Sequence, residues 1–120
     1  MERKYDLEYR LIDFASEIIS FTDSLVSSKA ASHMGGQLLR SGTSPALNYG
    51  EAQSGESRKD FIHKMKIVLK ELRESRVALK IIAKSKLTEE NNKNEELLDE
   101  CNQLISIFVK SIETAQRNYS

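Results

Sequence analysis

Residues 61–82 read FIHKMKIVLKELRESRVALKII, and the spacing of their apolar residues decides the fold class. Large apolar side chains recur every three or four positions, with Ser75 in the one gap: Phe61, Met65, Val68, Leu72, Leu79 and Ile82. Because an α-helix has about 3.6 residues per turn, this spacing places them all on one face. The stretch is therefore predicted to be an amphipathic helix that buries that face.

The same period occurs in two other parts of the chain. The first contains Leu7, Leu11, Phe14, Ile18, Phe21 and Leu25, with Ile12, Ala15, Ile19 and Val26 as a second stripe beside them. The other contains Leu97, Cys101, Leu104, Phe108 and Ala115. The doubled stripe is wider than a two-helix seam needs, so the first helix is expected to touch more than one neighbour. No segment alternates apolar and polar residues for long, so we expect no strands.

Polar residues between these segments indicate where helices begin and end. Ser57 followed by Asp60 resembles a capping box, and Thr88 followed by two glutamates is typical of a helix N-cap. The helices are expected at about 6–26, 31–54, 57–85 and 88–118. The short connection near residue 86 implies that the last two are antiparallel. The predicted fold is all-α, a single domain over residues 1–120 that forms an antiparallel up-down four-helix bundle.

Composition narrows the class of protein, but the net charge alone does not reveal that the basic residues are concentrated in one segment. The chain has 120 residues, one cysteine, 18 basic and 18 acidic side chains. A single cysteine cannot form an internal disulfide, and no signal-peptide or membrane-spanning run is present, so a cytoplasmic protein without membrane contact is expected. The zero net charge is a cancellation, because residues 57–86 carry ten basic and three acidic groups. Such segregation suggests an anionic partner.

The basic charge of the third helix is concentrated on one side. At 100° per residue, six basic side chains fall within about 80° of one another, opposite the apolar stripe. We call them the basic rail: Lys59, Lys66, Lys70, Arg73, Lys80 and Lys84. The rail could bind nucleic acid or another polyanion, pair with an acidic neighbouring subunit, or serve solubility alone. No aromatic residue interrupts it, so binding would use the nucleic-acid backbone and shape rather than base stacking.

The second expected helix, 31–54, has an unusual composition. It contains Pro45 and four of the five glycines, each of which costs helix stability. One interpretation is a marginal helix kinked near Pro45 with a polar outer face; the other is a close-packed helix whose polar side chains bond across a helix or subunit interface. The candidate interface or buried polar network comprises Arg40, Ser41, Thr43, Asn48, Glu51, Glu71 and Glu74. Arg40 and Glu51 are three turns apart, so each is expected to find a partner on another helix, with Lys64 or Lys70 included.

Catalytic and metal-binding patterns are nearly absent, so no enzyme activity, metal or other cofactor is expected. One histidine and one aspartate at i, i+3 do not supply the carboxylates that a di-iron bundle needs. A distant alternative is a HEPN-like ribonuclease, because Arg58 and His63 match the loose R-x4-6-H spacing of those enzymes. There they would act as transition-state clamp and general base.

Four ungapped motifs carry a resemblance to a known family. They are Gln37-Leu38-Leu39-Arg40-Ser41-Gly42-Thr43-Ser44, Asn48-Tyr49-x-Glu51-Ala52, Ser57-x-x-Asp60-Phe61-Ile62-x-Lys64 and Leu69-Lys70-Glu71-x-x-Glu74-Ser75. The sequence resembles the four-helix bundle protein family, also called the S23 ribosomal protein or 23S rRNA intervening-sequence protein family. It is also similar to the accessory variability protein of diversity-generating retroelements. The sequence departs from the family pattern at Pro45-Ala46 and Val77-Ala78.

The resemblance implies a bundle that assembles into a ring, commonly a homopentamer, with a link to structured RNA. Its retroelement relatives imply binding to nucleic acid and to a reverse transcriptase. The expected function is therefore a non-enzymatic oligomeric accessory protein that binds structured RNA or DNA through the basic rail. The alternative is a structural or protein-interaction ring in which the rail pairs with acidic neighbours.

Overall fold

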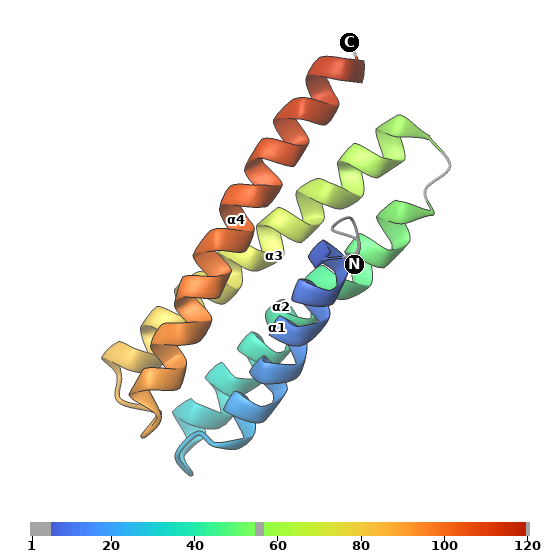
Figure 1. Cartoon of the computed structure of the whole chain (residues 1–120). Coiled ribbons are helices and arrows are strands. Elements are labelled where there is room, and N and C mark those ends of the chain that lie inside the picture. The colour runs from blue at the N-terminus through green and yellow to red at the C-terminus, as the bar shows by residue number, and fades with distance from the viewer. Residues whose placement is uncertain (1–5, 55–56, 120) are drawn as a thin grey trace.

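A computed structural model describes residues 6–54 and 57–119 (Figure 1). These residues form four helices and no strand. The helices are α1 (Asp6–Asp23), α2 (Lys29–Gln53), α3 (Arg58–Lys84) and α4 (Asn91–Tyr119). The all-α four-helix fold predicted from the sequence is confirmed, and the helix ends differ from the expected ones by at most three residues.

The helices pack as neighbours in chain order. Figure 1 shows each helix running back alongside the preceding one. Helix α2 packs extensively against both α1 and α3, α3 packs against α4, and the contact between α1 and α4 is much smaller. Helices α2 and α3 therefore have equally extensive contacts with their neighbours, and α1 and α4 close the bundle more loosely.

Serine hydroxyls begin two of the helices. The Ser57 side chain accepts a hydrogen bond from the Asp60 backbone N–H at 3.1 Å, as the capping pattern predicts. Ser28 does the same for α2 by accepting from the Ala31 N–H at 3.0 Å. Each hydroxyl satisfies one of the N–H groups that lack a partner within the first turn of a helix.

The N-cap predicted at Thr88 is wrong. Helix α4 begins at Asn91, and the buried Thr88 hydroxyl accepts from the Glu90 N–H at 2.9 Å, two residues along the chain. A Thr side chain can stabilise a turn in this way instead of a helix end. The Asn94 N–H then bonds the Glu90 carbonyl at 3.0 Å, which marks the first turn of α4.

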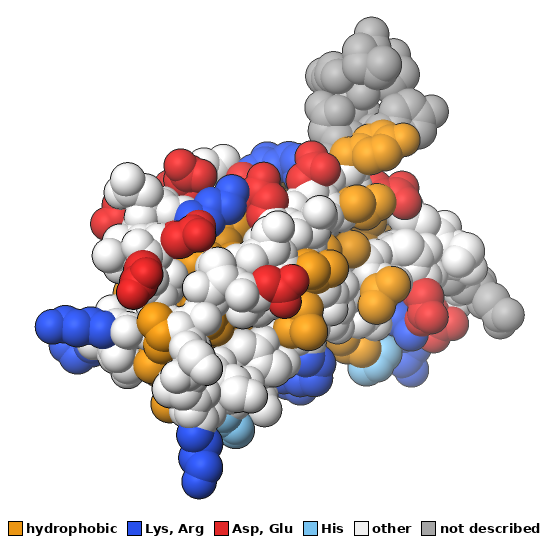
Figure 2. Space-filling model, turned by 90° about the horizontal axis from the view of Figure 1, so that it is seen from below, with side chains coloured by type: hydrophobic (Ala, Val, Ile, Leu, Met, Phe, Trp, Pro, Cys, Tyr) orange, Lys and Arg blue, Asp and Glu red, His pale blue; other side chains and the backbone are white. Residues whose placement is uncertain are grey.

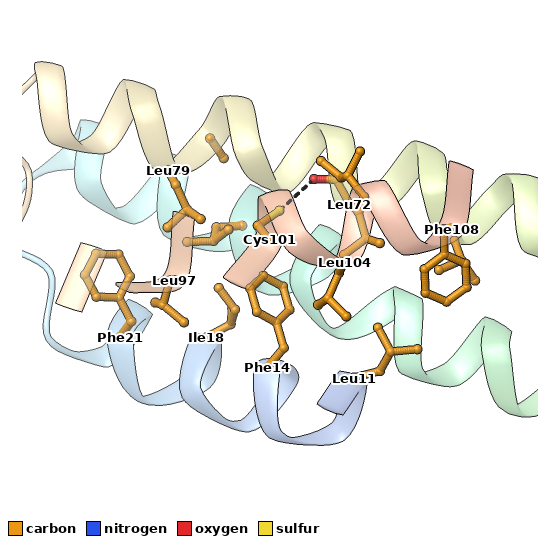
Figure 3. Close-up of a cluster of buried hydrophobic side chains, with 14 of the residues drawn as sticks. Leu11, Phe14, Ile18, Phe21, Leu72, Leu79, Leu97, Cys101, Leu104 and Phe108 are labelled. Atoms are coloured by element: carbon orange, nitrogen blue, oxygen red, sulfur yellow. Dashed lines mark hydrogen bonds between the residues drawn. The ribbon is translucent and has the colours of Figure 1, made fainter. Parts of the chain in front are cut away.

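The core follows the apolar stripes. In Figure 3 Phe14 of α1 lies beside Leu104 of α4, and Ile18 lies beside Leu97; all four are at most 2% exposed. The second stripe of α1 is not part of the core at two of its positions, because the side chains of Ile12 and Ile19 are 45% and 47% exposed. Helix α1 does contact two neighbours, as expected, but these two side chains lie on its outer surface.

Cys101 is a core residue with an inert thiol. Its Sγ donates a hydrogen bond to the Leu72 carbonyl at 3.1 Å, drawn as a dashed line in Figure 3. Burial raises the pKa of the Cys101 thiol to about 12, so the reactive thiolate is scarcely populated at neutral pH.

Close packing explains the composition of α2 near its middle. A Cβ added at Gly42 would lie 2.8 Å from Ile18 Cγ2 and 2.9 Å from Ile18 Cγ1, so only glycine allows this approach of α2 to α1. On the other side of α2, the buried Ser75 hydroxyl donates to the Ser41 hydroxyl at 2.9 Å. These contacts favour the close-packed interpretation. The helix is continuous through the buried Pro45, and the kink there stays a prediction.

Two glycine substitutions in the same helix test this packing. Gly42→Ala should lower the free energy of unfolding by about 1–3 kcal/mol, because the new methyl group overpacks against the buried Ile18. Gly36→Ala is the matched control: nothing lies within 4 Å of its Cβ position, so it should stabilise the fold by about 0.5–1 kcal/mol. Urea unfolding followed by circular dichroism measures both. Equal effects of the two substitutions would contradict the role given to Gly42.

Candidate functional site

The surface of the bundle separates its charges. Figure 2 shows most acidic side chains in the upper part of the view, most basic ones projecting from the lower part, and hydrophobic atoms between them. All six side chains of the basic rail are exposed. Within the described ranges, none of the six makes an ion pair or a side-chain hydrogen bond. In a single copy of the chain, the rail is therefore accessible to another molecule.

A groove of about 610 Å³ lies between α2 and α3 and includes part of this rail. Its lining comprises Met34, Gln37, Arg40, Ser41, Lys70, Arg73, Glu74, Val77, Ala78 and Ile81. Lys70 and Arg73 belong to both the rail and the groove. We call the whole feature the α2–α3 groove.

Sequence reasoning missed the apolar part of this surface. Val77 and Ile81 are 53% and 41% exposed, although both are large apolar residues. Val77 lies seven residues after Lys70 and four after Arg73, so it shares their side of α3. Its position out of phase with Leu72, Ser75 and Leu79 was the signal that could have placed it outside the core. The basic rail thus lies beside exposed apolar side chains.

An ion-pair cluster joins the two walls of the groove. Arg40 Nη1 lies 3.0 Å from Glu71 Oε1, and Arg40 Nη2 lies 2.6 Å from Glu74 Oε1. The hydrogen bond from Arg40 lowers the pKa of the Glu74 carboxyl, and the bonds to Glu74 and Glu71 raise the pKa of the Arg40 guanidinium. Arg40 and Glu74 are therefore both charged at neutral pH. The Arg40 side chain is half exposed, whereas that of Glu71 is only 10% exposed, so the cluster joins α2 to α3 at the margin of the core.

A second ion pair joins the same two helices further along. Lys64 Nζ lies 2.7 Å from Glu51 Oε1, and its hydrogen bond lowers the pKa of the Glu51 carboxyl. Arg40 and Glu51 thus each have a partner on α3, with Lys64 as one of these partners. Lys70 makes no ion pair among the described residues.

The side chains predicted to form an interface or buried polar network make contacts of different kinds. The Arg40–Glu74 and Glu51–Lys64 pairs lie at the surface, whereas Arg40 also bonds the buried Glu71 carboxylate. The Ser41 and Ser75 hydroxyls meet in the interior. Thr43 and Asn48 bond within α2, to the Leu39 carbonyl at 2.8 Å and the Ser44 carbonyl at 3.1 Å. Short polar side chains often find a carbonyl one turn earlier in their own helix, so neither contributes an interhelical bond here.

The residues of the nuclease alternative do not share a cavity. Arg58 lines a cavity of about 430 Å³ beside Tyr49 and Phe61, and the exposed His63 is not part of its lining. The described part of the chain contains no group of three or more His, Cys, Asp or Glu side chains placed to hold a metal ion. None of the described helices combines the length and the apolar character needed to cross a bilayer.

The fold and the site define a class: a four-helix bundle with a basic, partly apolar groove on one side. Residues 3–110 match the family described as 23S rRNA-intervening sequence protein, so the chain belongs to that family. This membership confirms the resemblance carried by the motifs of α2 and α3. No curated protein matches the chain.

A solved structure supports the same assignment. The chain is similar to a crystal structure of a protein with unknown function from the S23 ribosomal protein family of Bacteroides thetaiotaomicron VPI-5482. The TM-score is 0.81 at 28% sequence identity, over 88% of this chain and 97% of that one. The likeness thus extends over nearly the whole bundle.

The Arg40 cluster makes a prediction about one carboxyl group. Arg40→Gln should raise the pKa of Glu74 toward its ordinary value, because the substitution removes the charged hydrogen-bond donor. A pH titration of the Glu74 carboxyl carbon by NMR measures the change. Lys64→Gln is the control: it should raise the pKa of Glu51 and leave that of Glu74 unchanged. A Glu74 titration unaffected by Arg40→Gln would contradict the pairing.

The same pairing predicts a dependence of stability on pH. The folded pKa of Glu74 lies below its unfolded value, so the pair contributes stability above the unfolded pKa and loses it as pH falls through the folded pKa. When the pH falls from neutral to below the ordinary pKa of glutamate, the free energy of unfolding should therefore decrease less in Arg40→Gln than in the wild type. Urea unfolding at several pH values in that range measures the difference.

Proposed function

We propose that this protein is a non-enzymatic, oligomeric accessory protein of the cytoplasm that binds structured RNA, or a related nucleic acid, through the basic rail of α3. The observation that carries the proposal is the set of six exposed basic side chains on one side of one helix, without an ion-pair partner among the described residues. Lysines that served solubility alone would be expected to alternate with acidic side chains along the helix face.

The dimensions of the rail suit a phosphate backbone. From Lys59 to Lys84 the helix rises about 37 Å at 1.5 Å per residue, which spans several phosphates of one strand. The rail itself carries no aromatic side chain, so affinity would come from phosphate contacts and counterion release. A rigid, structured RNA offers phosphates at fixed positions, and such a surface would recognise its shape more than its sequence.

Charge reversal at three rail positions outside the groove tests this function. The combined variant Lys59→Glu, Lys66→Glu, Lys80→Glu should weaken binding of a structured RNA at about 50 mM salt by roughly 30-fold or more. Its salt dependence should fall by about 2–3 units of slope, since each lost phosphate contact removes close to one. Fluorescence anisotropy over a salt series measures both quantities.

The control has the same change in net charge at other exposed positions: Lys29→Glu, Lys86→Glu, Lys110→Glu. It should bind with nearly the wild-type affinity and slope. If the wild type retains no RNA at about 50 mM salt, or if the control loses as much affinity as the rail variant, the proposed function is wrong. Gel analysis of the same RNA after incubation with wild type and with His63→Ala addresses the nuclease alternative, which requires cleavage by the wild type alone.

The protein-interaction ring is a second candidate, and the exposure of Val77 and Ile81 beside the rail favours it. Large apolar side chains inside a charged surface are typical of protein contacts. Light-scattering mass with and without structured RNA, at low and high salt, separates the two candidates. In the first the mass of the assembly increases when RNA is added, whereas in the second it stays that of the protein assembly alone. A pentameric ring and a reverse-transcriptase partner stay predictions of the family resemblance.

A further inference from the structure

The outer side of α1 carries an exposed apolar surface. Tyr9, Ile12 and Ile19 are 63%, 45% and 47% exposed. Their spacing of three and seven residues places them on one side of the helix, away from the buried Phe14 and Ile18. We call these three residues the α1 ridge. Exposed aromatic and branched side chains in a row on one helix indicate a contact surface rather than a solvated one.

The ridge has acidic surroundings. Helix α1 contains five acidic residues and one basic residue, and the acidic Glu8, Asp13 and Asp23 are exposed. The ridge is therefore apolar at its centre and negative at its margins.

The α2–α3 groove has the complementary character. Its apolar surface comes from Met34, Val77 and Ile81, and its basic margin comes from Lys70 and Arg73. Apolar contact would supply affinity at the centre, whereas opposite charges at the margins would select the orientation. Two ridges would repel each other, and so would two grooves, because each pairing brings like charges together.

We infer that the α1 ridge of one copy docks into the α2–α3 groove of a second copy. The contact has to be intermolecular, because α1 contacts α2 and α4 but not α3 among the described helices. The two surfaces differ, so the contact is heterologous: every copy offers one ridge and one groove. Repetition of such a contact builds a closed ring or an open chain rather than a two-fold dimer.

This inference rests on the oligomeric part of the proposed function and not on RNA binding. It also divides the rail between two tasks. Lys70 and Arg73 line the groove and face the neighbouring copy, whereas Lys59, Lys66 and Lys80 lie outside its lining and remain for phosphates. The three-lysine variant described above should therefore keep the wild-type assembly while it loses RNA.

Two variants with opposite defects test the contact. The groove variant, Val77→Glu with Ile81→Glu, places acidic groups opposite the acidic margin of the ridge. The ridge variant, Tyr9→Ser with Ile12→Ser and Ile19→Ser, removes the apolar centre of the ridge. All five positions are exposed, so circular dichroism and thermal unfolding should show both variants folded. Light scattering at about 100 µM should show each variant alone as a monomer of 13.6 kDa, against a larger wild type.

The mixture of the two variants gives the decisive result. The groove variant keeps a working ridge, and the ridge variant keeps a working groove, so an equimolar mixture can form one contact and no more. The expected species is a heterodimer of twice the 13.6 kDa chain mass. The control Leu47→Ser changes a side chain that is 72% exposed and lines neither surface, and it should keep the wild-type mass.

Three outcomes overturn the inference: a monomeric wild type, a mixture that stays monomeric, or loss of assembly in Leu47→Ser. The RNA-binding proposal is tested separately, and its failure would not affect the docking contact. If the variants behave as expected and the three-lysine variant still binds RNA as the wild type does, then the basic rail is not the RNA surface and the docking contact stands.

Discussion

The close contact between α2 and both of its neighbours is the constraint on which the rest of the structure depends. On one side Gly42 admits the side chain of Ile18, and on the other the Ser41 hydroxyl receives the hydrogen bond of Ser75. These two consecutive residues of α2 therefore meet α1 and α3 at the same level of the bundle. A larger residue at position 42 would overpack against α1. Loss of either serine hydroxyl would remove the one fully buried side-chain hydrogen bond between α2 and α3 among the described residues.

The same contact determines what the surface can present. Because Ser41 is drawn against Ser75, the preceding Arg40 emerges at the edge of α2 within reach of two α3 carboxylates. The resulting cluster closes one side of the α2–α3 groove and engages two of the three acidic residues of α3 with one guanidinium. The basic side chains of the rail are left unbalanced along their helix. An accessible basic surface thus follows from packing inside the bundle as well as from the number of lysines.

Residues that belong to the periodic pattern were predictable, and residues outside it were not. Phe14, Leu72 and Cys101 are buried as their spacing implies, because a helix of 3.6 residues per turn leaves one face for the core. The N-cap at Ser57 was predictable because the capping pattern lies within a few consecutive residues. Thr88 was misplaced because a threonine hydroxyl serves a turn and a helix end equally well, and only the tertiary position of the chain decides between them.

The candidate site was predictable in its charge and not in its shape. The angular position of the rail followed from helix geometry alone, and so did the need for Arg40 and Glu51 to find partners on another helix. The groove depends on how far α2 and α3 stand apart, which no pattern within one helix encodes. Ile12 and Val77 show the same limit, since apolar residues beside a core stripe are buried or exposed according to the number of neighbours that the helix has.

The separation of charge also gives the molecule an electrical character that its neutrality hides. With 18 basic and 18 acidic side chains the chain has no net charge, so copies that approach each other meet no long-range repulsion. The unequal placement of those charges nevertheless produces a permanent dipole moment across the bundle, from the acidic α1 toward the basic α3. In the field of a polyanion, or of another copy, such a molecule experiences a torque before it experiences a net force. It would therefore turn its basic side toward negative charge at a distance, and the encounter would begin with the correct face in front.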